Sequence, residues 1–199
     1  MHRELSPKSL KLLGIVVLLL LTGVGWWVRR DRLAVELHAA AILGDKSRIR
    51  CAVAAGADVN ARGQFGSTAL ITVASIRDAE AIELLLNAGA DVNVRDNVTG
   101  ASPLLQAVLT APTSPRAALI TARLLLSRGA DVHAANETGL SPYRLALRWQ
   151  SRLERNPHHF LPALSPTREA EEAALADAED MRLLIQELIY HGRTRVAIQ

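Results

Sequence analysis

Apolar and polar residues follow one another along this chain in short blocks that return at a regular spacing. Three blocks end in the same run, Gly-Ala-Asp-Val, at residues 56–59, 89–92 and 129–132. Gly56 and Gly89 are 33 residues apart. A fixed period of this length indicates stacked copies of one small unit. Stacked units build an extended surface, and such surfaces are typical of proteins that bind other proteins.

The blocks also predict two helices in each unit. Residues 66–70, 100–104 and 139–143 place a hydroxyl residue before the helix, and in the last two cases a proline follows it, which suits a helix start. In the second and third units a later apolar segment ends in three leucines. Gly89 and Gly129 follow, where a glycine can adopt the left-handed conformation that ends a helix.

Residues 37–44, Leu-His-Ala-Ala-Ala-Ile-Leu-Gly, together with the Gly-Ala-Asp-Val runs, resemble the ankyrin repeat family over about residues 32–192. The resemblance implies an all-α solenoid of about four helix pairs, with hairpins between units and first helices lining a concave face. It implies units at about 32–61, 62–95, 96–134 and 135–192, and a tail at 193–199. The family's histidine occurs at His38, whereas Ile71 and Leu105 occupy the equivalent places.

The last unit is longer than the others, with a helical insertion at about residues 148–178. Helical spacing extends its first helix over residues 143–155, and Ser165 before Pro166 starts a second helix that runs to about residue 191. An apolar stripe marks this second helix at Leu175, Ala178, Arg182, Ile185 and Ile189, flanked by Met181, Leu184 and Leu188. We expect the two helices to cap the open end of the stack. The alternative is a partner-binding tip at residues 158–161.

Residues 12–28 carry no charge and lie between a basic tail, 1–11, and Arg29. A helix of this length rises about 25 Å, somewhat less than the ~30 Å hydrocarbon core of a bilayer. Trp26 and Trp27 would then lie at the interface, where indole rings are enriched. We interpret the segment as a transmembrane helix or signal anchor. The alternative is a signal peptide cleaved after residue 25.

The side of the membrane that carries the repeats is nearly balanced, because basic residues flank residues 12–28 on both sides. A short basic tail before a first apolar segment favours a periplasmic location for the repeats. Lys46 and Arg48 favour the cytoplasm instead. The Ala-, Arg- and Leu-rich composition suggests a bacterial source, and with residues 12–28 as the span we expect a single-pass protein of the inner membrane.

The sequence contains no glycine-rich phosphate loop, nucleophile elbow or zinc-protease motif. We therefore expect no enzyme activity, no cofactor, no metal and no small-molecule substrate. His158 and His159 lack the companion ligands that a metal site needs. The net charge of +3, without a long basic block, argues against nucleic acid. The single cysteine, Cys51, is expected to be a small core residue.

These observations predict a membrane-anchored, non-catalytic protein–protein interaction module. The resemblance extends this to an inhibitor or immunity factor for a partner protein. The alternative is a structural or recruiting subunit of a bacterial membrane complex. The candidate partner-binding residues lie in the hairpins and at the tip of the last unit: Arg62, Gln64, Phe65, Arg95, Asn97, Glu137, His158, His159, Phe160 and Leu161. The candidate membrane-interface residues are Trp26, Trp27, Arg29 and Arg30.

Overall fold

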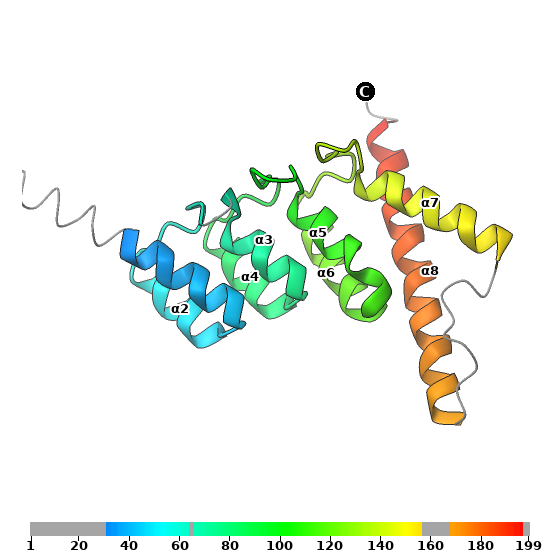
Figure 1. The fold of residues 1–199 in the computed structure, drawn as a ribbon, viewed down its shortest axis with the longest axis horizontal. Coiled ribbons are helices and arrows are strands. Elements are labelled where there is room, and N and C mark those ends of the chain that lie inside the picture. The colour runs from blue at the N-terminus through cyan, green and yellow to red at the C-terminus, as the bar shows by residue number, and fades with distance from the viewer. Residues whose placement is uncertain (1–30, 64–65, 157–167, 197–199) are drawn as a thin grey trace, which may run out of the picture.

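The computed structural model describes residues 31–63, 66–156 and 168–196. These residues form a row of helix pairs and contain no strand, so the predicted all-helical stack is confirmed (Figure 1). A first helix is described over residues 31–43. The others are α2 Lys46–Ala54, α3 Ala69–Ile76, α4 Ala79–Asn87, α5 Pro103–Leu109, the short 3₁₀ helix η2 Ala111–Thr113, α6 Pro115–Ser127, α7 Pro142–Arg155 and α8 Arg168–Val196.

Short polar side chains fix where several helices begin. Each accepts a hydrogen bond from the backbone N–H three residues later and so satisfies a donor that has no partner within the helix. The distances run from 3.0 to 3.2 Å, at Asp45, Asp78, Ser102 and Ser141. Pro103 and Pro142 occupy the first turn that follows, as the hydroxyl-proline pattern predicts.

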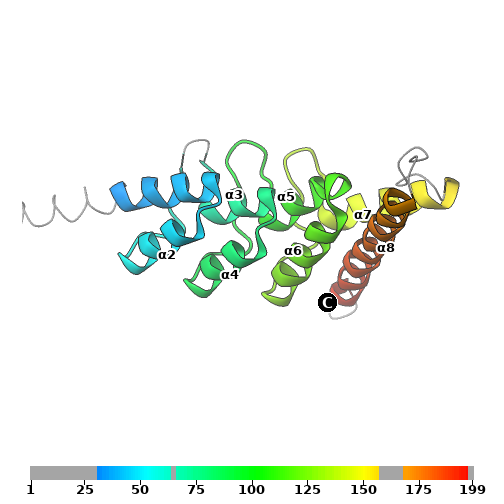
Figure 2. The same ribbon diagram turned by 90° about the horizontal axis from the view of Figure 1, so that it is seen from below.

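The helices lie in two rows (Figure 2). The first helix, α3 and α5 form one row, α2, α4 and α6 form the other, and the hairpins between units lie on the side of the first row. Apolar side chains fill the space between the rows, with the same position of successive first helices fully buried at Leu37, Leu70 and Leu104. Burying such a side chain contributes about 1.5–3 kcal/mol.

An asparagine at the end of each of the first two Gly-Ala-Asp-Val-Asn runs joins one unit to the next. The Asn60 side-chain amide donates to the Gly89 carbonyl at 3.1 Å and accepts from the Asp91 N–H at 2.8 Å. Asn93 repeats both bonds with Gly129, at 3.2 Å, and Asp131, at 2.8 Å. The repeated Gly-Ala-Asp-Val-Asn sequence thus supplies the hydrogen bonds that join one unit to the next.

The joint to the last unit differs. His133 replaces the asparagine, and its Nε2 lies 2.9 Å from the carbonyl oxygen of Gly192. The ring of His133 also packs on Tyr143, with ring centroids 4.9 Å apart. Gly192 does not end its helix, because α8 continues to Val196. The expectation that the helix ends near residue 191 was therefore wrong.

Two expectations about buried residues were also wrong. Cys51 is exposed, because α2 turns Ile49 and Ala52 toward the core and Cys51 lies on another side. Leu175, the first residue of the predicted stripe on α8, is 56% exposed. Farther along the helix the stripe meets the core as expected, because Ile185 and Ile189 are 3% and 9% exposed and the flanking Met181, Leu184 and Leu188 are fully buried.

Among the described residues no helix has the length and apolar character needed to cross a bilayer. Residues 12–28 lie outside the described ranges, as do Trp26, Trp27, Arg29 and Arg30. Their assignment as an anchor and its interface therefore stays a prediction.

Candidate partner-binding face

The middle of the row of first helices presents a surface without charged residues. Neither α3 nor α5 contains a charged residue. Four aliphatic side chains on this row are between 42% and 68% exposed: Ile42, Leu43, Ile76 and Leu109. Ile76 lies beside Gly44, with its Cδ1 3.6 Å from where a Cβ of that residue would stand, so the aliphatic residues of adjacent units are neighbours. We call these four residues the first-helix face.

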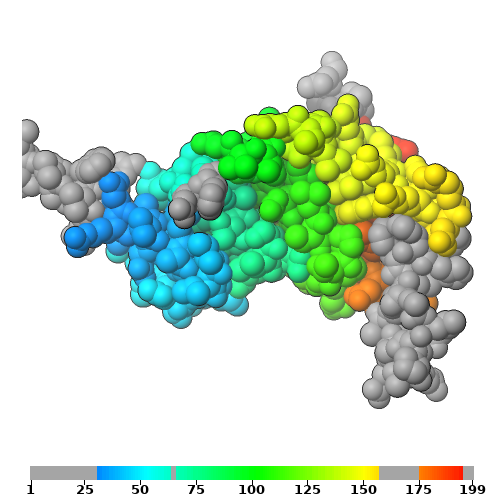
Figure 3. All heavy atoms as spheres, viewed as in Figure 1, coloured from blue at the N-terminus to red at the C-terminus, as the bar shows by residue number. Residues whose placement is uncertain are grey.

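Helix α7 continues this face at the far end of the stack, where it is coloured yellow (Figure 3). It carries arginines at helical spacing, and they are exposed: Arg144, Arg148, Arg152 and Arg155. Arg144 donates to the Gly139 carbonyl at 2.8 Å. Arg148 and Arg152 have no ion pair within the described part of the chain. The aliphatic surface therefore adjoins positive charge at one end.

The outer row of helices has the opposite character, because its charges are paired from unit to unit. Lys46 and Arg50 of α2 contact Glu80 of α4 at 2.7 and 2.9 Å. The hydrogen bond from Lys46 to Glu80 raises the pKa of Lys46 and lowers the pKa of Glu80. Arg128 of α6 lies 3.4 Å from Glu83, and Arg123 lies 3.5 Å from Glu187 of α8. Surface pairs of this kind leave few unsatisfied charges for a partner.

The hairpins contain four of the predicted binding residues, and the structure brings them together. The Arg62 guanidinium donates to the Gly66 and Arg95 carbonyls at 2.7 and 2.8 Å and to the Asn97 side chain at 2.8 Å. The Glu137 N–H donates to the Thr99 carbonyl at 2.9 Å. These residues tie each hairpin to the next one. Gln64, Phe65 and residues 158–161, which include His158, His159, Phe160 and Leu161, lie outside the described ranges.

A carboxylate shapes the hairpin before α5. Asp96 accepts from the N–H groups of Val98, Thr99 and Ala101 and from the Thr99 hydroxyl, at 2.6–2.9 Å. Burial alone would raise the pKa of Asp96, but these hydrogen bonds outweigh burial and hold the pKa below its usual value. Asn136 takes the same place in the next hairpin and accepts from Thr138 and Leu140.

Sequence analysis missed Arg77, which ends α3. Its φ is +59°, a left-handed conformation that costs a non-glycine residue about 1–2 kcal/mol. The first unit has Gly44 at this position, with φ +66°. The Arg77 side chain donates to the Thr110 carbonyl at 3.1 Å and so joins the α3–α4 turn to the end of α5. Comparison with Gly44 would have revealed the position from the sequence.

His38 makes the contact expected of the family's histidine. Its Nε2 lies 3.1 Å from the Ser67 carbonyl oxygen and its Nδ1 lies 2.9 Å from that of Ala34. In the next two units Ile71 and Leu105 are buried instead. Within the described residues no three His, Cys, Asp or Glu side chains are grouped so that they could hold a metal ion.

Comparison with known proteins agrees with this geometry. The family model described as "Ankyrin repeats (3 copies)" matches residues 37–136, about half of the chain. Protein PhlB of Serratia liquefaciens is 37% identical over 118 residues, which cover 59% of this chain and 49% of that protein. The chain thus spans about half the length of this curated relative. The helix pairs, the repeated asparagine joints and the family match together show that the chain belongs to the ankyrin repeat family, whose repeats act as protein–protein interaction modules.

Proposed function

We propose that this chain is a non-catalytic binding module that docks a partner protein on the first-helix face. The observation that supports this most directly is the contrast between the two rows of helices. Exposed Ile42, Leu43, Ile76 and Leu109 lie at or near the C-terminal ends of helices in a row where α3 and α5 have no charge, whereas the outer row pairs several of its charges internally. Contiguous exposed apolar surface is typical of protein interaction sites.

The joints and hairpins support tight binding as well, because they hold this face in one shape. Asn60, Asn93 and Arg62 cross-link neighbouring units through hydrogen bonds of 2.7–3.2 Å. A surface that is ordered before binding loses less conformational entropy when the partner arrives. The partner's matching surface should be largely aliphatic, with carboxylates at the end that meets Arg148 and Arg152 of α7.

We further propose that residues 12–28 anchor the module in a membrane and that the module inhibits its partner there. The uncharged run of residues 12–28 supports the anchor. Inhibition is supported only by analogy with other bacterial ankyrin proteins, since a fold does not define a function. Because the described first helix begins by residue 31, the repeats would lie close to the lipid headgroups.

A pair of matched substitutions tests the binding face. Ile76 on α3 is 44% exposed and Ile120 on α6 is 49% exposed, so Ile76→Glu and Ile120→Glu introduce the same charge at similar exposure on opposite rows. Partners captured by the full chain from the native membrane would be identified and then titrated as purified proteins. We expect Ile76→Glu to weaken binding by tenfold or more, roughly 1.4 kcal/mol, and Ile120→Glu to leave it unchanged.

Loss of binding with Ile120→Glu alone would instead place the partner on the outer row, and no partner at micromolar concentrations would contradict the proposal. A captured partner with enzymatic activity is then assayed with saturating chain. Loss of activity supports an inhibitor. Unchanged activity supports a recruiting subunit, and exchange of residues 12–28 for an unrelated span then shows whether the segment does more than anchor.

Location is tested separately with a topology reporter fused after Gln199. Reporter signal in the periplasm supports the favoured orientation, whereas cytoplasmic signal reverses it. Extraction of the full chain from membranes by alkaline carbonate would contradict an integral anchor.

A further inference from the structure

Helices α7 and α8 enclose an open groove of about 620 Å³ at the end of the stack. The groove lies on the side of α8 opposite the one that packs on the previous unit. Leu184 and Leu188 are fully buried and Glu187 pairs with Arg123 of α6, which defines the packed side. Gln186 and Arg193 line the groove about half a turn away from that side.

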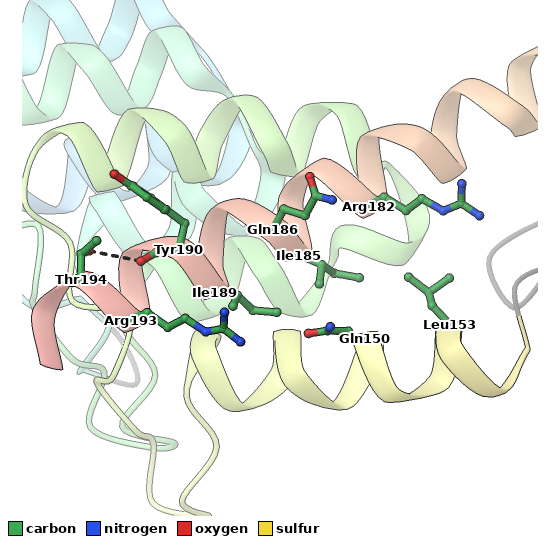
Figure 4. A pocket seen from close by; sticks show the side chains of 9 residues that line it. All are labelled: Gln150, Leu153, Arg182, Ile185, Gln186, Ile189, Tyr190, Arg193 and Thr194. Atoms are coloured by element: carbon green, nitrogen blue, oxygen red, sulfur yellow. Dashed lines mark hydrogen bonds between the residues drawn. The ribbon is translucent and has the colours of Figure 1, made fainter. Parts of the chain in front are cut away.

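The floor of the groove is apolar. Ile185 and Ile189 of α8, which are 3% and 9% exposed, point into the gap between the two helices, opposite the half-buried Leu153 of α7 (Figure 4). Tyr190 lies on the other flank of α8 and is 65% exposed. The lining residues of α8 recur at positions 182, 185, 186, 189, 190, 193 and 194. This is the three- and four-residue spacing of a helix face that packs against another helix.

Positive charge marks both ends of this floor. Arg182 lies at one end of the groove and Arg193 at the other (Figure 4). Eleven residues are close to three helical turns, so the two guanidinium groups lie on the same side of α8 about 16 Å apart along its axis. Both are exposed, and neither has an ion pair within the described residues. None of the residues that line the groove is a carboxylate.

This charge pattern selects among possible occupants. A second copy of the chain that docked through the same groove would bring like-charged arginines together, because a two-fold interface places one surface against itself. A helix with carboxylates at the matching spacing would pair with both arginines and cover the apolar floor. Carboxylate–guanidinium pairing gives orientation as well as attraction.

We propose that the groove between α7 and α8 is a second docking site, for an amphipathic α-helix of a partner protein. The helix presents an apolar stripe to Leu153, Ile185 and Ile189 and carries carboxylates about three turns apart for Arg182 and Arg193. The site is separate from the first-helix face.

The probe is a synthetic helical peptide of about 18 residues, roughly 27 Å long. It has leucines at three- and four-residue spacing and a glutamate at each of two positions three turns apart. Two control peptides replace the glutamates by lysine or the leucines by serine. Binding to the full chain in zwitterionic lipid nanodiscs is followed by fluorescence anisotropy, with empty nanodiscs as the blank. We expect the glutamate peptide to bind about tenfold more tightly than either control.

A charge exchange locates the binding. In the double variant Arg182→Glu, Arg193→Glu the preference should reverse, with the lysine peptide now binding about tenfold more tightly than the glutamate peptide. The matched variant Arg32→Glu, Arg116→Glu changes the net charge equally, away from the groove, and should keep the original preference. Circular dichroism checks that both variants keep their helix content.

The proposal is overturned if the glutamate peptide fails to bind below about 1 mM, if it binds no better than the serine control, or if the matched variant also reverses the preference. Dimerisation of the full chain that Arg182→Glu, Arg193→Glu enhances would show that a second copy occupies the groove instead. Ile76→Glu should leave peptide binding unchanged, so failure of the first-helix face and failure of the groove are distinguishable.

Discussion

The joints between the first three units and the joint to the last unit connect neighbouring repeats through different interactions. Asn60 and Asn93 each donate to a glycine carbonyl and accept from an aspartate N–H, with distances that agree within 0.1 Å. His133 contacts the carbonyl of Gly192 and packs its ring on Tyr143. The regular joints therefore depend on hydrogen bonds at the surface, whereas the last joint depends on close packing of rings and a helix.

This difference follows from what comes after each joint. Gly89 and Gly129 have φ of +89° and +86° and end their helices, and the backbone N–H two residues later, of Asp91 or Asp131, donates to the asparagine. Gly192 lies inside α8, where the N–H groups are used by the helix itself. A long terminal helix thus removes the partner for one of the two hydrogen bonds. The imidazole ring of His133 makes van der Waals contact with Tyr143 in place of that hydrogen bond.

The strongest test of the packed joint is Gly192→Ala. Within a helix this change is normally favourable by about 1 kcal/mol, but here a Cβ would collide with the ring of Tyr143. We expect a net loss of about 2–3 kcal/mol in the free energy of unfolding, measured by urea denaturation of the full chain. In a Tyr143→Ala background the same change should cost nothing. Equal costs in both backgrounds would show that the ring does not cause the effect.

The regular joint is tested by Asn93→Ala, which removes both of its hydrogen bonds. We expect a loss of about 1–2 kcal/mol, and a smaller loss for His133→Ala, which removes one hydrogen bond and a ring contact. Gly89→Ala serves as a comparison, because no atom lies within 4 Å of a Cβ there and only the positive φ is strained. A larger effect at His133 than at Asn93 would reverse the ranking of the two joints.

Arg77 adds a contact that the joints do not provide, and its two roles can be separated. Arg77→Ala loses the hydrogen bond to the Thr110 carbonyl and keeps the strained φ of +59°. Arg77→Gly loses the same bond but relieves the strain. We expect the glycine variant to be more stable than the alanine variant by about 1 kcal/mol, as measured by thermal unfolding. Equal stability would mean that the turn relaxes in the variants.

The smallest effect should be a change in pH dependence at the hairpins. The folded-state pKa of Asp96 is lowered, so its contribution is present above the unfolded pKa of about 3.9 and is lost as the pH falls further, through the folded value. Asp96→Asn should therefore reduce the dependence of the urea midpoint on pH below about 4. Asn136→Asp, at the equivalent position of the next hairpin, should increase it. This prediction is contradicted if the urea midpoint depends on pH equally in both variants and in the parent protein.

Local patterns predicted much of this fold correctly. Ser102 and Ser141 before proline predicted the starts of α5 and α7, because a cap acts within one helical turn. Helical spacing predicted the last unit's first helix over residues 143–155, and α7 spans Pro142–Arg155. The Gly-Ala-Asp-Val repeats predicted the stack itself, because one unit cannot bury its apolar surface alone.

Features that depend on distant residues could not be read in this way. The spacing along α8 predicted an apolar stripe but not which neighbour would cover it, and the groove at Ile185 and Ile189 follows from how α7 and α6 share that helix. The contacts of the Arg62 guanidinium within the stack are another example. They reach residues up to 35 positions away, which no local pattern encodes.

The hydrogen bonds of Arg62 couple the movements of two neighbouring hairpins. One side chain holds its own hairpin at Gly66 and the following hairpin at Arg95 and Asn97, so displacement of either loop pulls on the other. Arg62→Ala should uncouple them and raise the amide hydrogen-exchange rates of residues 95–100 as well as those around Gly66. The hairpins would then move independently of one another, whereas in the parent protein the movement of one is coupled to the next.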